Sequence, residues 1–328
     1  MKLLLIFTGG TIGSTFDGAY IATDSDKPYV LLDTYKKIHP MPDYDTDEPF
    51  TMLSENATGT EISALIRCVG EKLGAYDGII ITHGTDTLQY TAAALSYAFG
   101  TVRTPICLVS SNFPIEHEKA NGIDNLFGAV SLLQQGTEEG VFVSYRNPGD
   151  PDITIHRAAR LLASAAYSDS FFSVCAKPYG WISSKSGAFT KNPEYSESPD
   201  AQNPLRPHSL SSGSDSILRI SPYPGMTYPI LPPQTRAILH ESFHSGTINT
   251  LSPDARRFFA QAKEQGIPVF LTGVSSGDSY ESTSVFEELG IIPLPVISPI
   301  AAYLKLWFAD ACGYDLKTAL MLPLGGDF

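Results

Sequence analysis

The sequence predicts an α/β protein with a larger, mostly parallel sheet domain followed by a smaller α/β domain. Short aliphatic runs alternate with amphipathic segments along most of its 328 residues, and repeated βα units of this kind form a parallel sheet covered by helices. The first run, Leu3 to Phe7, is apolar at every position, as expected of a strand buried on both faces. Between 183 and 216 the sequence is rich in Ser, Pro, Gly and Asn and nearly free of aliphatic residues, which predicts an extended linker.

The first domain is expected to span 1–182 and to contain a flavodoxin- or Rossmann-like sheet. Its aliphatic runs predict strands at 3–7, 50–53, 77–82, 105–109 and 140–144, with helices at 29–38, 60–73, 92–99 and 125–133. The segment 60–73 has the clearest helical pattern, because Ile62, Leu65, Ile66 and Val69 fall on one face.

The second domain is expected to span 217–328, after the linker at 183–216. The same alternation of short aliphatic runs and amphipathic segments resumes there. It predicts strands at 216–220, 235–240 and 268–272, and helices at 253–265, 283–289 and 299–310. No internal repeat relates the two domains.

The composition argues against several classes of function. The net charge of −13 disfavours nucleic-acid binding, which requires clustered Lys and Arg. The four cysteines are scattered with no CxxC pair, as in a cytoplasmic protein with reduced thiols. No run approaches the roughly 18 apolar residues of a membrane span, and the first run is too short for a signal-peptide core. We therefore expect a soluble cytoplasmic protein that binds neither nucleic acid nor membranes.

Polar side chains follow three of the expected strands: Thr11 follows the first, Ser54 and Glu55 the second, and Thr85 and Asp86 the third. Ligands of open α/β sheets bind outside the carboxyl ends of the strands, where these side chains would meet. A threonine hydroxyl can attack a carbonyl when a neighbouring group activates it, and a carboxylate can bind an ammonium group. Backbone amides at the adjacent glycine turns could form an oxyanion hole. The combination favours acyl transfer on a small, charged carbonyl substrate.

Two motifs resemble the signatures of the bacterial-type L-asparaginase family, in particular its cytoplasmic type I branch. They are Thr8-Gly9-Gly10-Thr11-Ile12-Gly13 and His83-Gly84-Thr85-Asp86-Thr87. The resemblance covers nearly the whole chain and implies hydrolysis of L-asparagine to L-aspartate and ammonia. It also implies that Thr11 is the nucleophile that forms an acyl-enzyme and that Tyr20 assists it from a loop. Thr85 and Asp86 would belong to a second catalytic group.

The resemblance also implies the substrate-binding residues, which are Gly10, Ser54, Glu55, Gly84 and Asn112, with Ser54 on the substrate carboxylate. The implied partner is a small molecule, L-asparagine or L-aspartate, and no cofactor is expected. Members of the family complete each site with a neighbour's second domain, which implies a homodimer or homotetramer. We expect no metal site, because the i, i+4 pair His240 and His244 would require a helix where the pattern predicts a strand and a Ser-Gly turn.

One expected residue is missing from the second catalytic group. The family places a lysine roughly nine residues before a Phe-x-Ser segment, and counting back from Phe171-Phe172-Ser173 gives Leu162. Arg157 and Arg160 lie nearby, but a guanidinium with a pKa above about 12 is a poor base. Lys177 could reach in from the following loop. Activation of the nucleophile is therefore rewired, or the protein is a slow or altered amidohydrolase.

Other interpretations fit parts of the sequence. The main alternative, motivated by Leu162, is an asparaginase-like protein that binds or senses aspartate or asparagine with little or no turnover. A nucleotide-binding protein is disfavoured, because Gly9-Gly10 is not part of a G-x-G-x-x-G motif and no Walker lysine is present. The amide-releasing subunit of an archaeal-type tRNA amidotransferase shares the two motifs, but it normally carries an extra domain before them. His83 is interpreted as a structural hydrogen-bonding residue rather than a base.

Overall fold

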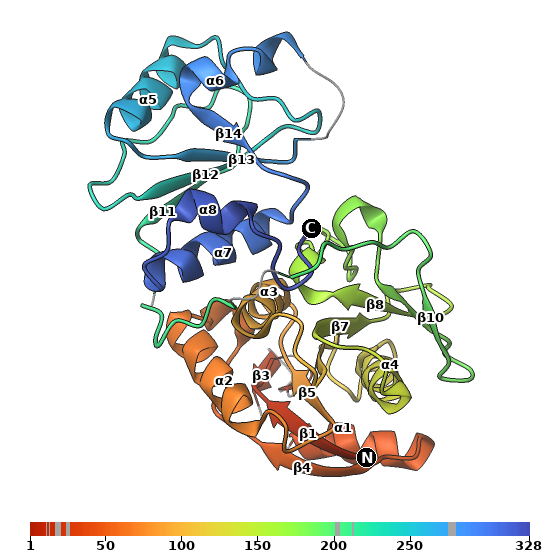
Figure 1. Cartoon of the computed structure of the whole chain (residues 1–328). Coiled ribbons are helices and arrows are strands. Elements are labelled where there is room, and N and C mark those ends of the chain that lie inside the picture. The colour runs from red at the N-terminus through yellow and green to blue at the C-terminus, as the bar shows by residue number, and fades with distance from the viewer. Residues whose placement is uncertain are drawn as a thin grey trace.

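The computed structural model contains a large, mostly parallel sheet and a small parallel sheet, which lie at opposite ends of the molecule in Figure 1. It describes residues 1–10, 12, 14–16, 21–23, 27–200, 204–211, 213–274 and 280–328. Within these residues the large sheet has the strand order β10-β9-β8-β7-β6-β5-β1-β4 and the small sheet the order β11-β12-β13-β14. The α/β class predicted from the sequence is confirmed.

The strands of the large sheet run parallel from β4 to β7, while β8, β9 and β10 are added antiparallel. They are β1 (Lys2–Phe7), β4 (Asp43–Asp47), β5 (Gly78–Thr82), β6 (Ile106–Val109), β7 (Val141–Tyr145), β8 (Ile153–Arg157), β9 (Gly180–Ile182) and β10 (Phe189–Lys191). The small sheet consists of β11 (Ile217–Ile220), β12 (Ala237–Glu241), β13 (Val269–Thr272) and β14 (Ile291–Pro293). A separate antiparallel ribbon pairs β2 (Ser14–Phe16) with β3 (Ile21–Thr23).

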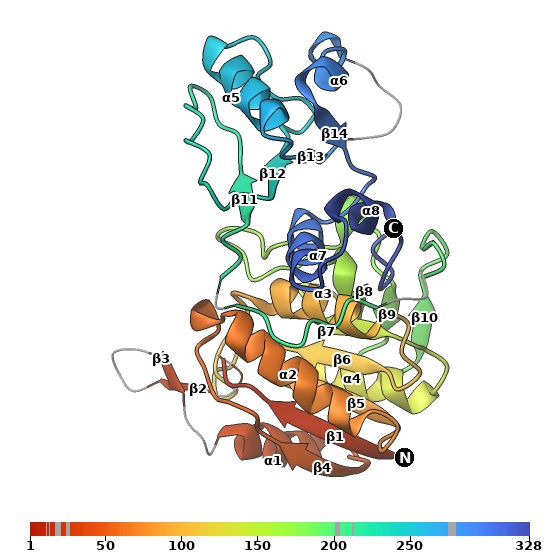
Figure 2. The same cartoon turned by 60° about the vertical axis from the view of Figure 1, so that its left-hand side comes forward.

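Helices cover both faces of the large sheet. Figure 2 shows α2 and α3 on one face and α1 and α4 on the other. The helices are α1 (Lys27–Ile38), α2 (Gly59–Lys72), α3 (Leu88–Phe99), α4 (Gly122–Gln135), α5 (Pro253–Glu264), α6 (Phe286–Leu289), α7 (Pro299–Ala311) and α8 (Leu316–Met321). None of the described helices is long and apolar enough to cross a bilayer.

Strand β1 lies inside the large sheet, between β4 and β5. Its side chains alternate between the two faces, so that Leu4 and Ile6 pack in the core under α2 and α3, and Leu3, Leu5 and Phe7 in the core under α1 and α4. Each such side chain stabilises the fold by about 1.5–3 kcal/mol when fully buried. This double burial explains why the run is apolar at every position, and it fixes where the chain leaves the sheet at Thr8.

Helix α2 agrees closely with the helix expected at 60–73. Thr58 precedes it and forms a capping box with Glu61, which satisfies backbone N–H groups of the first turn. Its face toward the sheet buries Ile62, Leu65 and Val69. The amphipathic pattern and the cap therefore specify the same helix.

The expectation about the next strand was wrong. The segment Asp43–Asp47 forms β4 although it reads Asp-Tyr-Asp-Thr-Asp, and the strand expected at 50–53 is absent from the described structure apart from a single bridge between Met52 and Gly9. A strand at the edge of a sheet need not be a continuous apolar run, because it is partly exposed to solvent. Lys2 and Lys72 form ion pairs with carboxylates of β4, at 2.7 Å and 3.5 Å.

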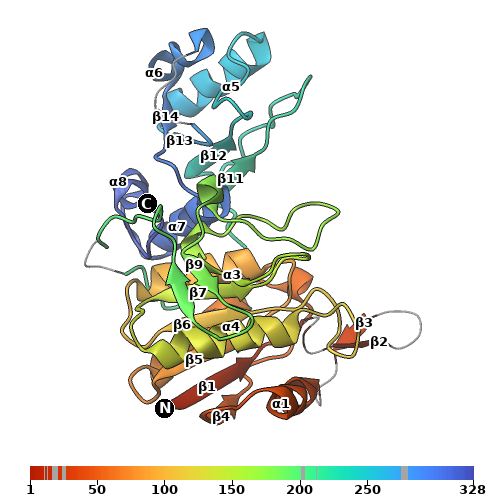
Figure 3. The ribbon, with the colours of Figure 1, turned by 90° about the vertical axis from the view of Figure 1, so that its right-hand side faces the viewer.

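Helix α7 lies between the two sheets. It packs on α3 and also contacts β11 and β12, and Figure 3 shows it between α3 and the small sheet. The expected linker at 183–216 also contributes to the large sheet, because β10 falls within it and pairs with β9. The chain between β10 and β11 then leads to the small sheet.

Candidate active site

The turn after β1 brings the main chain into close contact with two other segments. Gly9 and Gly10 have φ values of +89° and +80°, and the Gly10 N–H donates to the Met52 carbonyl at 2.9 Å. A Cβ atom on Gly10 would lie 2.3 Å from the Cα of Gly84. Both the backbone conformation and the lack of space therefore require glycine at Gly10.

Ser54 and Asp86 meet beside this turn. The hydroxyl of Ser54, which is 3% exposed, donates to Oδ2 of Asp86 at 3.5 Å. A Cβ atom on Gly84 would lie 2.3 Å from the Ser54 hydroxyl oxygen, so Gly84 lets the two turns approach. We refer to Gly10, Ser54, Gly84 and Asp86 as the strand-end cluster. Gly10 follows β1, and Gly84 and Asp86 follow β5, as expected. Ser54 comes from the segment before α2, because the strand expected to precede it is not formed.

The turn that carries Asp86 is held to Ser54 by its neighbours. The Thr87 hydroxyl donates to the Ser54 carbonyl at 2.8 Å, and the Gln89 amide donates to the Asp86 carbonyl at 2.9 Å. Thr87 ends the second sequence motif, and its place directly before α3 was the sequence feature that could have predicted this role. These bonds fix the Asp86 backbone while its side chain remains exposed.

The electrostatics of the site are acidic. Glu55 and Asp86 are both exposed, and Thr85 beside Asp86 is half-buried. The Asp86 carboxylate beside the buried Ser54 hydroxyl, with Glu55 next to Ser54 in the chain, provides a partner for a ligand that carries an ammonium group. The catalytic candidates Thr11 and Tyr20 lie outside the described residues, so their roles remain predictions.

Asn112 belongs to a different set of contacts. Its N–H donates to Oδ1 of Asn121 at 2.9 Å, and the Asn121 N–H donates back to Oδ1 of Asn112 at 3.1 Å. It lines a cavity of about 340 Å³ together with Lys119 and Arg146. Among the described residues, no hydrogen bond joins Asn112 to the strand-end cluster. Its place beyond the end of β6 still puts it at the carboxyl edge of the large sheet.

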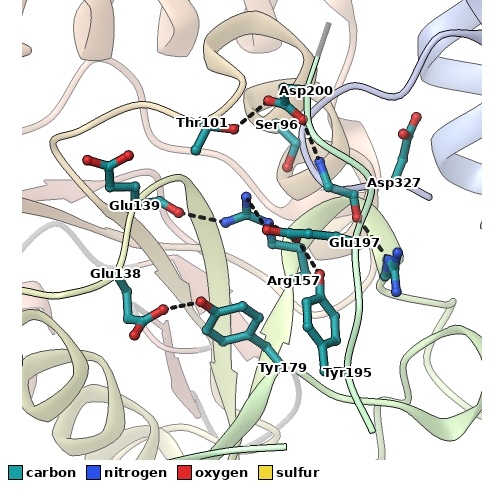
Figure 4. A network of polar contacts seen from close by, with 12 residues as sticks. Ser96, Thr101, Glu138, Glu139, Arg157, Tyr179, Tyr195, Glu197, Asp200 and Asp327 are labelled. Carbon is teal, nitrogen blue, oxygen red and sulfur yellow. Dashed lines mark hydrogen bonds and ion pairs between the residues drawn. The ribbon is translucent and has the colours of Figure 1, made fainter. Parts of the chain in front are cut away.

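Both arginines near Leu162 that could substitute for the lysine expected from the family pattern already have partners. Figure 4 shows Arg157, which is 2% exposed, between Glu197 and Glu139; it forms an ion pair with Glu197 at 3.1 Å and donates to the Glu139 carbonyl at 2.7 Å. Arg160 donates to the Gly326 carbonyl at 2.9 Å. Both guanidinium groups are thus held by partners outside the strand-end cluster, whereas Lys177 is exposed.

The sequence model of the family described as "Asparaginase, N-terminal" matches residues 2–195, which is more than half of the chain. The chain belongs to the asparaginase family. The resemblance inferred from the two motifs is therefore confirmed at the level of the family. The matched residues include all of the strand-end cluster and the strands β1 and β5 that precede its turns.

Relatives of this asparaginase-family chain have different names. One subunit of the glutamyl-tRNA(Gln) amidotransferase of Aeropyrum pernix is 26% identical over 325 residues, covering 93% of this chain and 73% of that protein. The 60 kDa lysophospholipase of Mus musculus is 25% identical over 337 residues, covering 93% of this chain and 58% of that protein. The chain thus spans less than two thirds of the mouse protein's own length.

Solved structures share the fold. The thermostable L-asparaginase from Thermococcus kodakarensis has a TM-score of 0.77 at 24% identity, over 97% of this chain and 95% of that one. L-asparaginase I from Vibrio cholerae has a TM-score of 0.75 at 23% identity, over 97% and 95%. At these identities the likeness shows the fold, and the choice of substrate has to be argued from the site.

Proposed function

We propose that this asparaginase-family chain hydrolyses L-asparagine to L-aspartate and ammonia through an acyl intermediate on Thr11. The Thr11 oxygen would attack the side-chain amide carbon, and the C–N bond would break as the amide nitrogen takes up the proton lost by the hydroxyl and leaves as ammonia. Water would then hydrolyse the ester to release aspartate and restore the hydroxyl. The observation that carries this proposal is the strand-end cluster, whose member Gly10 directly precedes Thr11 in the chain.

The chemistry of the cluster supports an amino-acid substrate. The Asp86 carboxylate suits an α-ammonium group, and the Ser54 hydroxyl, 3.5 Å from it, suits an α-carboxylate. Glu55 would add to the field that attracts the ammonium group. The backbone around Gly10 and Gly84 would stabilise the developing oxyanion, since backbone N–H groups aimed at such a charge lower the barrier. Tyr20 would assist the Thr11 nucleophile, as the family resemblance implies.

An ammonia-release assay on L-asparagine, L-glutamine and simple amides would test this function. We expect release from asparagine, accompanied by an equal amount of aspartate. Release from glutamine alone would favour a second candidate, glutamine amide release for a transfer reaction, which is supported by the name of the Aeropyrum pernix relative. Aspartate binding without release from any amide would support the sensing alternative.

Asp86→Ala is expected to weaken aspartate binding by about tenfold or more. Removing one partner of a charge pair that becomes desolvated costs about 2–5 kcal/mol, and Asp86 is the carboxylate nearest the Ser54 hydroxyl among the described contacts. Isothermal titration calorimetry with L-aspartate measures the effect. Asp43→Ala is a matched control, because it makes the same substitution on β4 opposite Lys2, at the amino end of β1. Equal affinities of the wild type and Asp86→Ala would contradict the assignment.

Leu162→Lys is expected to raise the rate of ammonia release by roughly tenfold or more, because general-base assistance contributes about 10²–10⁴ in rate. The main-chain N–H of Leu162 donates to the Phe172 carbonyl at 2.9 Å, a contact that the substitution preserves. Leu162→Met is the control for a change of shape without charge. If Leu162→Lys leaves the rate unchanged and Lys177→Ala abolishes it, the base is Lys177.

Further proposals concern the protein's location, partners, assembly and domain organisation. We propose that the protein acts in the cytoplasm on a small molecule, without a cofactor, nucleic acid or membrane partner. A solved structure named as a probable cytoplasmic L-asparaginase, from Campylobacter jejuni, shares the fold with a TM-score of 0.70. We also propose a homodimer or homotetramer, with the described residues forming a catalytic domain at 1–182, a linker at 183–216 and a second domain at 217–328.

A further inference from the structure

His83 stands at the start of the turn that carries Thr85 and Asp86, and its ring is completely buried. Ring atom Nδ1 lies 2.8 Å from the Gly84 carbonyl oxygen. Ring atom Nε2 lies 2.9 Å from the hydroxyl oxygen of Thr91, on the first turns of α3. One side chain therefore connects the beginning of the turn to the helix that follows it.

The two partners determine where the ring proton lies. A carbonyl oxygen can only accept, so Nδ1 of His83 carries the proton and donates to Gly84. Nε2 then accepts a hydrogen bond from the Thr91 hydroxyl. Burial lowers the pKa of His83 to about 4, although the bond to Gly84 acts in the opposite direction. The ring is thus neutral near pH 7, and its role is that of a fixed donor and acceptor rather than a base.

The main chain of His83 is anchored from the neighbouring strand. The Ser110 hydroxyl, just after β6, donates to the His83 carbonyl at 2.7 Å. Asn125 on α4 donates in turn to the Ser110 carbonyl at 2.7 Å, and its own Oδ1 accepts from the Arg146 N–H at 2.7 Å. These contacts hold the backbone of His83 in place, so that its ring stays within hydrogen-bonding distance of the Gly84 carbonyl.

Gly84 is also tightly enclosed by other members of the strand-end cluster. A Cβ atom there would lie 2.3 Å from the Ser54 hydroxyl oxygen, and Gly84 approaches Gly10 from the other side. A rotation of the Gly84 peptide would therefore disturb both neighbours. It would also redirect Asp86, two residues further on.

We propose that His83 is a positioning residue, whose Nδ1–H holds the Gly84 carbonyl and thereby the orientation in which Thr85 and Asp86 meet a bound amino acid. This inference rests on the proposed function for the identity of the ligand. It assigns His83 no contact with substrate. Its consequence is that the bond to Gly84, rather than the volume of the ring, sets ligand affinity.

Two amide substitutions separate the two ring contacts. The side-chain nitrogen of asparagine is two bonds from Cβ, like Nδ1, so His83→Asn can keep the donor to Gly84. The side-chain oxygen of glutamine is three bonds from Cβ, like Nε2, so His83→Gln keeps an acceptor for the Thr91 hydroxyl and loses the donor to Gly84. Thr91→Val removes the Thr91 bond alone. All three variants are compared with the wild-type full chain by thermal unfolding, aspartate calorimetry and hydrogen exchange of residues 83–90.

We expect His83→Gln to weaken aspartate binding by about tenfold and to speed amide exchange in 83–90 by a similar factor, the size of effect that follows when a buried acceptor loses its donor. His83→Asn and Thr91→Val should stay within about threefold of the wild type in both measurements. Equal behaviour of His83→Gln and His83→Asn, or changes that follow only the unfolding temperature, would overturn the proposal. Hydrogen exchange needs no ligand, so it decides the positioning role even if the wild type releases no ammonia and the proposed function fails.

Discussion

Replacing Thr11 with alanine is expected to reduce ammonia release from asparagine by about 10³-fold or more, because loss of the nucleophile closes the covalent route. Thr11 directly follows Gly9 and Gly10, whose positive φ values turn the chain at the end of β1. Affinity for aspartate should change by less than about threefold, because Ser54 and Asp86 are unchanged. Steady-state kinetics and calorimetry on the same preparation measure the two effects.

Thr11→Ser is the matched control, because it keeps the hydroxyl and loses only a methyl group. It should recover much of the activity that Thr11→Ala lacks. If Thr11→Ala retained a rate within a few-fold of the wild type, with Thr11→Ser equally active, the acyl-threonine mechanism would be wrong. The asparaginase-family assignment would stand in that case, and another nucleophile would have to be sought at the same edge of the sheet.

The elements that the sequence predicts best are those buried on one side or on both. Leu3 to Phe7 is fully apolar because both faces of β1 are covered, and the 3.6-residue pattern of α2 follows from its packing on the sheet. In both cases the burial that stabilises the element also leaves the pattern in the sequence. The α/β class with a large and a small parallel sheet could therefore be predicted from such segments.

Elements at the edges leave a weaker pattern. Strand β4 is polar because it lies at one edge of the large sheet, and β10, at the other edge, lies in a segment whose composition resembles a linker. Pairing with a neighbouring backbone requires no particular side chain. The antiparallel direction of β8 to β10 could not be predicted either, since a strand's direction is set by its connections.

The approach of Gly10 to Gly84 and Asp86 was predictable from the sheet topology, whereas Ser54 joins them from the segment before α2 and not from a strand end. Parallel strands place their carboxyl ends at one edge, so the turns after β1 and β5 were expected to meet. The ring contacts of His83 were not foreseeable in detail, since they depend on where Thr91 falls on α3. The partners of Arg157 and Arg160 could not be predicted either, because Glu197 and Gly326 are far away in the sequence.

Asp327→Asn is expected to lower the free energy of unfolding by about 3–5 kcal/mol, because it leaves a buried cation without its counter-ion. Lys305 on α7 and Asp327 are 1% and 0% exposed at the side chain, and their charged atoms lie 2.7 Å apart. The Tyr97 hydroxyl on α3 donates to the same carboxylate at 3.1 Å, so Asp327 connects α3 to α7. Burial raises the pKa of Asp327 and lowers that of Lys305, while the attraction between them opposes both shifts.

Two further variants test whether the expected loss of stability comes from leaving the buried Lys305 charge unpaired. Glu288→Ala removes a carboxylate that is 68% exposed and 3.8 Å from Arg256, and an exposed pair of this kind is worth about 0–1 kcal/mol. Adding Lys305→Met to Asp327→Asn should recover most of the loss, because an apolar side chain in place of an unpaired buried charge removes the desolvation cost. Denaturant titration of all three variants measures these differences. Tyr97 and Lys305 belong to α3 and α7, the helices that lie between the large sheet and the small one. If Asp327→Asn lowered the free energy of unfolding no more than Glu288→Ala does, apolar packing alone would hold α3 against α7.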